Sequence, residues 1–129
     1  MTIRPATLQD LEGIQRVLSA CDLDISGVDY SRWDGVALVA EQDEQVVGFA
    51  HVIPTHPVAI LTVLGVLPAY RKAHVGTELL KGMELLLRSL GMKVWWTFVG
   101  DSHEAALAGI DKWDGVVPGG SGQTFVRRF

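Results

Sequence analysis

The sequence predicts a mixed α/β fold, in which helices flank one twisted central sheet. Two observations carry this prediction. Two segments repeat apolar residues at helical spacing, and apolar runs rich in β-branched residues alternate with them along the chain. A length of 129 residues and an apolar fraction of 48% are typical of one ordinary domain with its own core. We find no repeat or linker, so we expect a single domain over residues 1–129.

The first elements are expected to be a strand, a helix and a hairpin. After a short extended start, Thr7 stands three residues before Asp10, which is the spacing of a capping box. The apolar face of the helix that follows is formed by Leu11, Ile14, Val17, Leu18 and Cys21. Two strand-like runs, Val36–Glu41 and Val46–Ile53, are then separated by four polar residues, so we expect them to form a hairpin.

The rest of the chain predicts a central strand and a long helix. The run Val58–Val66 is almost continuously apolar, as in a strand covered on both faces. An apolar stripe over residues 75–90 predicts an amphipathic helix, which Gly91 ends. Further elements are expected as a strand at Lys93–Val99, a short helix starting at Asp101 or Ser102, and a last strand at Gln123–Phe129. That last strand is a candidate pairing edge for a homodimer.

The composition restricts which binding partners and which cellular compartment we expect. A formal net charge of −4 gives no general attraction to nucleic acid or to an anionic membrane, so neither partner is expected. The lone Cys21 excludes an intrachain disulfide and a cysteine-rich zinc site, which is usual in a reducing compartment. The chain start lacks a signal-peptide layout, and the longest apolar stretch, Val58–Leu67, is too short for a membrane span. We therefore expect a cytoplasmic protein that holds no metal.

The most informative segment covers residues 66–80. A buried strand ends there, and a short basic turn with Arg71 and Lys72 leads directly into the long helix. The first N–H groups of a helix lack partners within it, and its dipole adds partial positive charge. Such a turn indicates an anion site suited to a phosphate, and Gly76 would let the backbone approach it closely. The alternative is a basic turn that merely caps the helix.

This segment resembles a family signature. The pattern Val66-x-Pro68-x-x-Arg71-x-x-x-Val75-Gly76-x-x-Leu79-Leu80 is similar to the acyl-CoA pyrophosphate signature of the GNAT superfamily of N-acyltransferases. The run His103–Leu107 resembles the family's later helix motif. The resemblance covers the whole chain and implies a mostly antiparallel sheet in which Val58–Val66 splays from Lys93–Val99, with the pantetheine arm of acetyl-CoA in the gap. It also implies acetyl transfer to a primary amine by direct attack.

The resemblance implies a set of cofactor-binding residues. Backbone groups of Leu64 and Val66 would bond the pantetheine, and Arg71 would add charge beside the pyrophosphate. The amides expected to hold the pyrophosphate are those of Lys72, Ala73, His74, Val75, Gly76 and Thr77. His103 either hydrogen-bonds the pantetheine or the departing sulfur, or is an exposed residue in the first turn of a helix.

Three positions depart from the family pattern. His74 stands at the central glycine of the core motif, where its imidazole would either crowd the diphosphate or donate to it. Ile60 stands where a glutamate often acts as general base, and Ile110 where a tyrosine often protonates the leaving thiolate. No side chain therefore stands out as the base. The alternative function is a catalytically silent module that binds acyl-CoA or a protein partner.

His51, Thr62 and His103 are the remaining candidates for proton transfer. Strand alternation gives His51 the same-face neighbours Val47, Phe49 and Ile53, and gives Thr62 the neighbours Ile60, Leu64 and Val66. A water chain involving His51 or Thr62 would deprotonate an ammonium, and His103 would handle the thiolate. The structural alternatives are a hydrogen-bonded core histidine, a strand threonine and an exposed helix residue.

The acceptor amine would meet the polar loop Asp22–Asp34. Its carboxylates, above all Asp24 and Asp29, could hold a cationic amine, and Tyr30 and Trp33 could line its pocket. The alternative is a solvated loop whose aromatic residues anchor it to the core. An amino acid, a polyamine, a drug, a peptide N-terminus and a protein lysine all stay open as acceptors.

Overall fold

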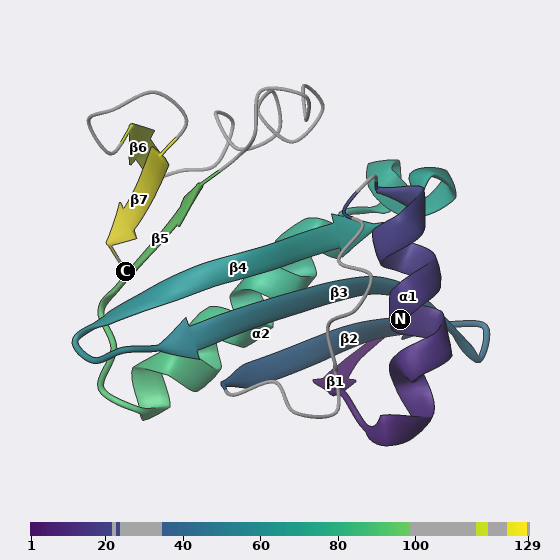
Figure 1. The fold of residues 1–129 in the computed structure, drawn as a ribbon, viewed down its shortest axis with the longest axis horizontal. Coiled ribbons are helices and arrows are strands. Elements are labelled where there is room, and N and C mark those ends of the chain that lie inside the picture. Colours follow the sequence, from purple (N-terminus) through teal and green to yellow (C-terminus); the bar gives the residue numbers. More distant parts are fainter. Residues whose placement is uncertain (22, 24–34, 99–115, 119–123, 129) are drawn as a thin grey trace.

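One mixed sheet contains every strand that the structure describes (Figure 1). The computed structural model describes residues 1–21, 23, 35–98, 116–118 and 124–128. In these ranges seven strands follow the spatial order β1-β2-β3-β4-β5-β7-β6. Their bounds are β1 Thr2–Pro5, β2 Val36–Gln42, β3 Gln45–Pro54, β4 Val58–Val66, β5 Val94–Phe98, β6 Val116–Pro118 and β7 Thr124–Arg128. β4 and β5 run parallel, and the other neighbouring pairs are antiparallel.

The two described α-helices, α1 (Leu11–Ala20) and α2 (Val75–Ser89), cover opposite faces of this sheet. In Figure 1, α1 lies in front of the strands and α2 behind them. The α1-side core consists of Ile14, Val17, Leu18, Val39, Val46 and Phe49. The α2-side core includes Leu38, Ala40, Val47, Ala50, Val52, Leu61, Val66, Val75, Leu79, Met83, Leu87 and Trp95. The predicted fold class, a mostly antiparallel sheet flanked by helices, is confirmed.

The predicted capping box is present at the start of α1. Thr7 and Asp10 form it, and a 3₁₀ turn at Leu8–Asp10 precedes the helix. Arg4 donates to both oxygens of the Asp10 carboxylate, at 2.8 and 2.9 Å, and to Glu41 of β2 at 3.0 Å. These bonds tie β1, the start of α1 and β2 together, and we refer to Arg4, Thr7, Asp10 and Glu41 as the N-terminal clasp.

The long helix α2 ends as its sequence predicts. Gly91 adopts a φ of +83°, which a residue without a Cβ accepts most easily. Its N–H donates to the carbonyl of Arg88 at 3.0 Å, and the N–H of Met92 donates to that of Leu87 at 2.9 Å. Both bonds satisfy carbonyls of the last turn. Neither described helix combines the length and the apolar character that crossing a membrane requires.

The hairpin between β2 and β3 closes on two residues. Gln42 pairs with Gln45, and Asp43 and Glu44 between them have φ values of 54° and 62°. Two successive left-handed residues are the signature of a type I′ turn, whose twist matches that of the flanking strands. The predicted hairpin is confirmed, although neither position is the glycine that such turns favour.

A β-bulge in β3 changes the faces expected from alternation. Ala40 pairs with Gly48 but Glu41 pairs with Val46, so Val47 is an extra residue in β3. Val47 consequently packs in the α2-side core, whereas Phe49 packs in the α1-side core. The prediction that these two residues share a face was wrong, because the bulge shifts the alternation by one residue.

A second β-bulge lies in β4. His51 pairs with Val63 and Val52 pairs with Leu61, which leaves Thr62 as the extra residue. Leu64 packs against the α2-side core, and Val66 belongs to it. Thr62 instead bonds His51, which lies two residues from Phe49 on the α1-side face. The prediction that Thr62 shares a face with Leu64 and Val66 was therefore wrong, for the same physical reason as in β3.

The C-terminal part of the sheet agrees with the sequence where the structure describes it. β5 and β7 match the strands expected at Lys93–Val99 and Gln123–Phe129 to within one residue at each end. The short strand β6 was not predicted, and it pairs with β7. The expected helix after Asp101 and the polar loop Asp22–Asp34 lie outside the described residues, apart from Leu23.

Candidate active site

The parallel strands β4 and β5 part in the middle of the sheet. Their ladder ends at the pair formed by Ile60 and Trp96, although β4 continues to Val66. The next contact is a side-chain bond, in which the Thr97 hydroxyl donates to the Leu61 carbonyl at 2.9 Å. Figure 1 shows the two strands diverging beyond this point. The C-terminal half of β4 thus continues without β5 beside it, which is the separation that the sequence resemblance implies.

The C-terminal end of β4 leads into α2 through a 3₁₀ helix at Pro68–Ala73. The exposed Arg71 side chain folds back over the strand end, where its Nε donates to the Val66 carbonyl at 3.1 Å. The thiol of Cys21, at the end of α1, donates to the same carbonyl at 3.3 Å, and Nη2 of Arg71 lies 3.6 Å from its sulfur. The predicted basic turn therefore places a guanidinium where β4, α1 and α2 meet.

His74 occupies the hinge between the 3₁₀ helix and α2. It is exposed and adopts left-handed backbone angles, φ 61° and ψ 22°. Such angles are uncommon for residues other than glycine, although histidine, asparagine and aspartate tolerate them better than most. The backbone thus explains why a glycine suits this position in the motif, and histidine meets the same requirement at a conformational cost of about 1 kcal/mol.

The first turn of α2 presents its N–H groups at the same end of β4. The carbonyl of His74 accepts the bond from the Glu78 N–H at 3.0 Å, so the N–H groups at residues 75–77 precede the first helical bond. A Cβ added to Gly76 would lie 3.8 Å from the nearest side-chain atom, Cγ2 of Val66, which is ordinary contact. Packing against β4 therefore does not by itself require a glycine at this position. The Val75 side chain is fully buried, so only its backbone could face a ligand.

His51 and Thr62 form a polar pair on the α1-side face of the sheet. Nδ1 of His51 lies 2.5 Å from the Thr62 hydroxyl oxygen, and this hydroxyl donates to the His51 carbonyl at 3.1 Å. His51 is buried, with 6% of its surface exposed, whereas Thr62 is exposed. Thr62 stands two residues beyond Ile60, the last β4 residue paired with β5. The pair therefore lies where the two strands separate.

A buried polar contact also joins β5 to α2, on the α2-side face of the sheet. The indole N–H of Trp95, which is fully buried, donates to the Glu84 carboxylate of α2 at 2.9 Å. This bond anchors β5 to α2 next to the separation of the strands. Trp95 packs in the α2-side core, whereas Trp96 on the other face is half-buried. Ile60, which stands at the family's glutamate position, is also half-buried.

Several predicted site residues cannot be placed. Asp24, Asp29, Tyr30, Trp33 and His103 lie outside the described residues. Of Lys72, the backbone is described within the 3₁₀ helix but the side chain is not. Ala73 is exposed and Thr77 half-buried on the two sides of His74. Among the described residues, no group of three or more histidine, cysteine, aspartate or glutamate side chains could hold a metal ion.

Two features of this region have no signal in the sequence. Cys21 was interpreted only as part of an apolar helix face, yet it bonds the end of β4 across 45 positions of sequence. The bulge at Thr62 lies inside a run that is apolar except for Thr62 itself, and no glycine or proline stands at the bulge to mark it. The first depends on how α1 packs against the sheet, and the second on how β3 and β4 pair.

Comparisons with known proteins agree with this geometry. The model of the acetyltransferase (GNAT) family matches residues 7–110. A search of the curated proteins found no match. Among solved structures, the chain is similar to the PaiA N-acetyltransferase of Thermoplasma acidophilum, crystallised with coenzyme A, with a TM-score of 0.83 and 18% identity over 99% of this chain and 98% of that one.

Two further solved structures show the same fold. The ribosomal-protein-S18-alanine N-acetyltransferase of Escherichia coli aligns with a TM-score of 0.73 at 18% identity, over 98% of this chain and 92% of that one. A GNAT family acetyltransferase of Brucella melitensis, in complex with acetyl-CoA, aligns with a TM-score of 0.70 at 19% identity, over 99% and 87%. At these identities the likeness concerns the arrangement of the elements.

Proposed function

Since the chain belongs to the GNAT acetyltransferase family, whose model covers residues 7–110, we propose that it transfers an acetyl group from acetyl-CoA to a primary amine. The observation that carries this proposal is the separation of β4 from β5 after Ile60, next to a cationic turn that opens α2. An extended thioester could lie along the unpaired half of β4 with its phosphates at the turn.

The residues at the turn suit a pyrophosphate. The guanidinium of Arg71 and the N–H groups at residues 75–77 lie at the same end of β4, and both favour an anion. Glu78 is the acidic residue of the first turn of α2, and its carboxylate lies 3.5 Å from the Lys81 ammonium, which offsets its charge. Arg71, the amides of residues 72–77 and the backbone of Leu64 and Val66 would hold the cofactor.

The reaction would need little covalent chemistry from the protein. The thioester supplies an activated acyl group, and holding a neutral amine against it converts a bimolecular step into one within a complex. Such positioning can lower the barrier by roughly 7 to 11 kcal/mol in ideal geometry. Backbone N–H groups along the unpaired part of β4, near Leu64, would polarise the carbonyl. The acceptor is proposed only as a primary amine.

Calorimetric titration of acetyl-CoA into the protein tests the cofactor site. We expect Arg71→Glu to weaken binding roughly tenfold or more, because a charge-assisted bond to phosphate is replaced by repulsion. Arg128→Glu changes the net charge equally and is the matched control. Arg128 pairs with Val94 at the start of β5, away from the turn, and should leave the affinity unchanged.

A third variant, His74→Gly, uses the same titration. Weaker binding would mean that the imidazole donates to a phosphate, and tighter binding that it crowds the phosphate. If the folded wild-type protein does not bind acetyl-CoA, or if Arg128→Glu weakens binding as much as Arg71→Glu, the proposed cofactor site is wrong.

A further inference from the structure

We propose that Arg71 blocks the place of the cofactor at the end of β4 in the free protein, and that it moves from the Val66 carbonyl to the pyrophosphate when acetyl-CoA binds. Cys21 makes this exchange necessary, because its thiol occupies the second lone pair of the same carbonyl. The inference rests on the proposed function, in which acetyl-CoA is the cofactor. It makes Cys21, at the end of α1, a residue that sets the affinity for this cofactor.

The Val66 carbonyl points to the edge of β4 that β5 has left. The N–H of Leu67 donates to the Val47 carbonyl of β3 at 2.9 Å. The Val66 carbonyl belongs to the same peptide unit as this N–H, and in a trans peptide the two groups point in opposite directions. It therefore faces away from β3, towards the side on which the β4–β5 ladder ends at Ile60. A pantetheine arm lying along this edge would present its amide N–H groups to this carbonyl.

Two donors already bond this carbonyl. Nε of Arg71 donates at 3.1 Å, and the Cys21 thiol donates at 3.3 Å. Both directions are determined, since a carbonyl only accepts hydrogen bonds. Nη2 of Arg71 also lies 3.6 Å from the Cys21 sulfur, which is the acceptor in this contact because a guanidinium only donates. A backbone carbonyl has two lone pairs, so an N–H of pantetheine can bond Val66 only when one of the two donors leaves.

Arg71 is the donor that can leave. Its side chain is exposed, and a guanidinium bonds charged phosphate oxygens more strongly than a neutral carbonyl. The Cys21 side chain is half-buried and packs against the α1-side core. Its sulfur lies close to β4, since a Cβ added to Gly65 would come within 3.2 Å of it. Figure 1 shows the ends of α1 and β4 beside the 3₁₀ helix. Packing thus holds the thiol in place, whereas the guanidinium can turn to the phosphates.

The exchange lowers the affinity of the wild-type protein for acetyl-CoA. Binding has to break the bond from Arg71 to the carbonyl and its contact with the sulfur, and the measured affinity includes this cost. Without the thiol, the carbonyl keeps one lone pair for the cofactor, and Arg71 loses one of these two contacts. Removal of the Cys21 thiol should therefore tighten binding. A contact that only supports the site would have the opposite effect or none.

Calorimetric titration of acetyl-CoA into variants of Cys21 tests the inference. We expect Cys21→Ala to bind about fivefold more tightly than the wild type, since roughly one net hydrogen bond no longer has to be broken. Cys21→Ser keeps a donor and an acceptor at this place, so its affinity should stay within about twofold of the wild type. Ser19→Ala is the matched control, because Ser19 is exposed near the same end of α1, and it should leave the affinity unchanged. Unchanged or weaker binding by folded Cys21→Ala would overturn the proposal.

Crystal structures of the wild type with and without coenzyme A follow the exchange directly. In the free protein we expect Nε of Arg71 at hydrogen-bonding distance from the Val66 carbonyl. In the complex we expect a pantetheine N–H on this carbonyl, the Cys21 thiol still bonded to it, and the guanidinium on the pyrophosphate. A complex in which Arg71 keeps its bond to Val66, or a free protein that lacks this bond, would also overturn the proposal.

The failure of this inference can be told from that of the proposed function. If neither the wild type nor Cys21→Ala binds acetyl-CoA, the proposed cofactor site is wrong and the exchange is wrong with it. If both bind with the same affinity, the cofactor site stands and only the exchange is wrong. Circular dichroism shows whether each variant is folded, and the two wild-type structures decide the question if a variant is not.

Discussion

The bulges in β3 and β4 are alike in the backbone but differ in what their extra residues do. Each inserts one residue into a strand of the same antiparallel pair, Val47 in β3 and Thr62 in β4. Val47 is fully buried in the α2-side core, whereas Thr62 is exposed and bonds His51. A bulge re-aims a side chain, and the type of residue at that position decides whether it packs in the core or hydrogen-bonds a neighbouring strand.

The surroundings of the two bulges differ in the same way. Beside the first, Glu41 of β2 pairs with Val46 and accepts a bond from Arg4 as part of the N-terminal clasp. Beside the second, β4 loses its neighbour β5. The first bulge is thus next to ion pairs that join β1, β2 and the start of α1, and the second is next to the point where β5 separates from β4.

The largest expected effect is a difference in the free energy of unfolding between variants at the two bulges. Val47→Ala removes buried methyl groups and should lower the free energy of unfolding by roughly 2 to 3 kcal/mol. Thr62→Ala removes the hydroxyl that bonds the ring and the carbonyl of His51 and should cost about 1 kcal/mol. Urea unfolding measures both values. Equal costs would contradict the comparison.

The N-terminal clasp predicts a pH dependence. The bonds from Arg4, helped by those from Thr7, hold the pKa of Asp10 at about 2, below its ordinary 3.8. Because the folded state has the lower pKa, this stabilisation is complete above pH 4 and is lost as the pH falls towards 2. It amounts to about 2 kcal/mol.

Urea unfolding at pH 6, 3 and 2 measures this loss. Asp10→Asn should be less stable at pH 6 and should lack this part of the decline. The affinity for acetyl-CoA at pH 6 should be unchanged in the variant, since the clasp lies away from the turn at Arg71. A variant with the same pH dependence as the wild type would show that another carboxylate is responsible.

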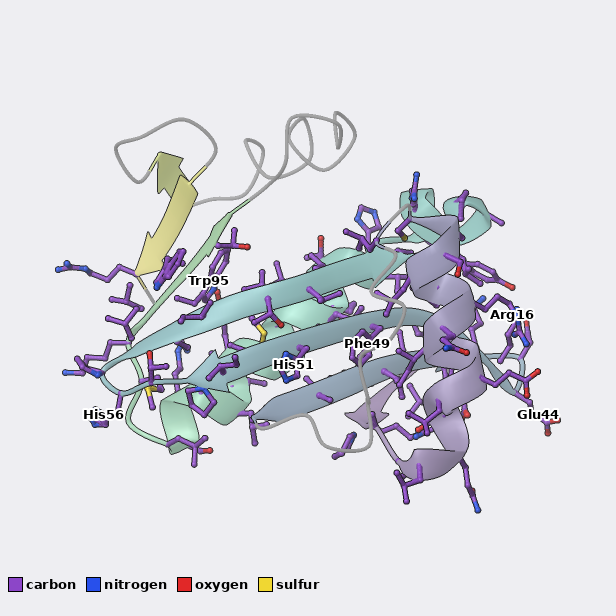
Figure 2. All side chains as sticks on the ribbon, viewed as in Figure 1. Arg16, Glu44, Phe49, His51, His56 and Trp95 are labelled. Atoms are coloured by element: carbon purple, nitrogen blue, oxygen red, sulfur yellow. The ribbon has the colours of Figure 1, made fainter. Side chains whose placement is uncertain are left out.

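The smallest expected effect concerns the turn next to the first bulge. Glu44, seen at the tip of the β2–β3 hairpin in Figure 2, has a φ of 62°. Glu44→Gly removes the steric cost of this left-handed conformation and should raise the free energy of unfolding by roughly 0.5 to 1 kcal/mol. Thermal unfolding measures the gain. Lower stability of the variant would show that the entropy of the unfolded chain outweighs the strain.

Most elements of the fold could be predicted from the sequence, whereas the details of the site could not. Helical periodicity predicted α1 and α2, and the Thr7–Asp10 spacing and Gly91 predicted where these helices begin and end. The motif at residues 66–80 predicted a cationic turn at a helix start, and Arg71 lies there. The faces of Val47 and Thr62 were predicted wrongly, because alternation holds only within an uninterrupted ladder.

The sequence by itself determined the order of the elements, the amphipathic faces and the basic turn, since these depend on residues that are close along the chain. The tertiary structure alone decided the side-chain contacts of the candidate site. The pairing of His51 with Thr62 joins strands across 11 positions, and that of Cys21 with Arg71 joins α1 to the turn across 50. Such contacts depend on strand register and on which elements pack together, and local spacing encodes neither.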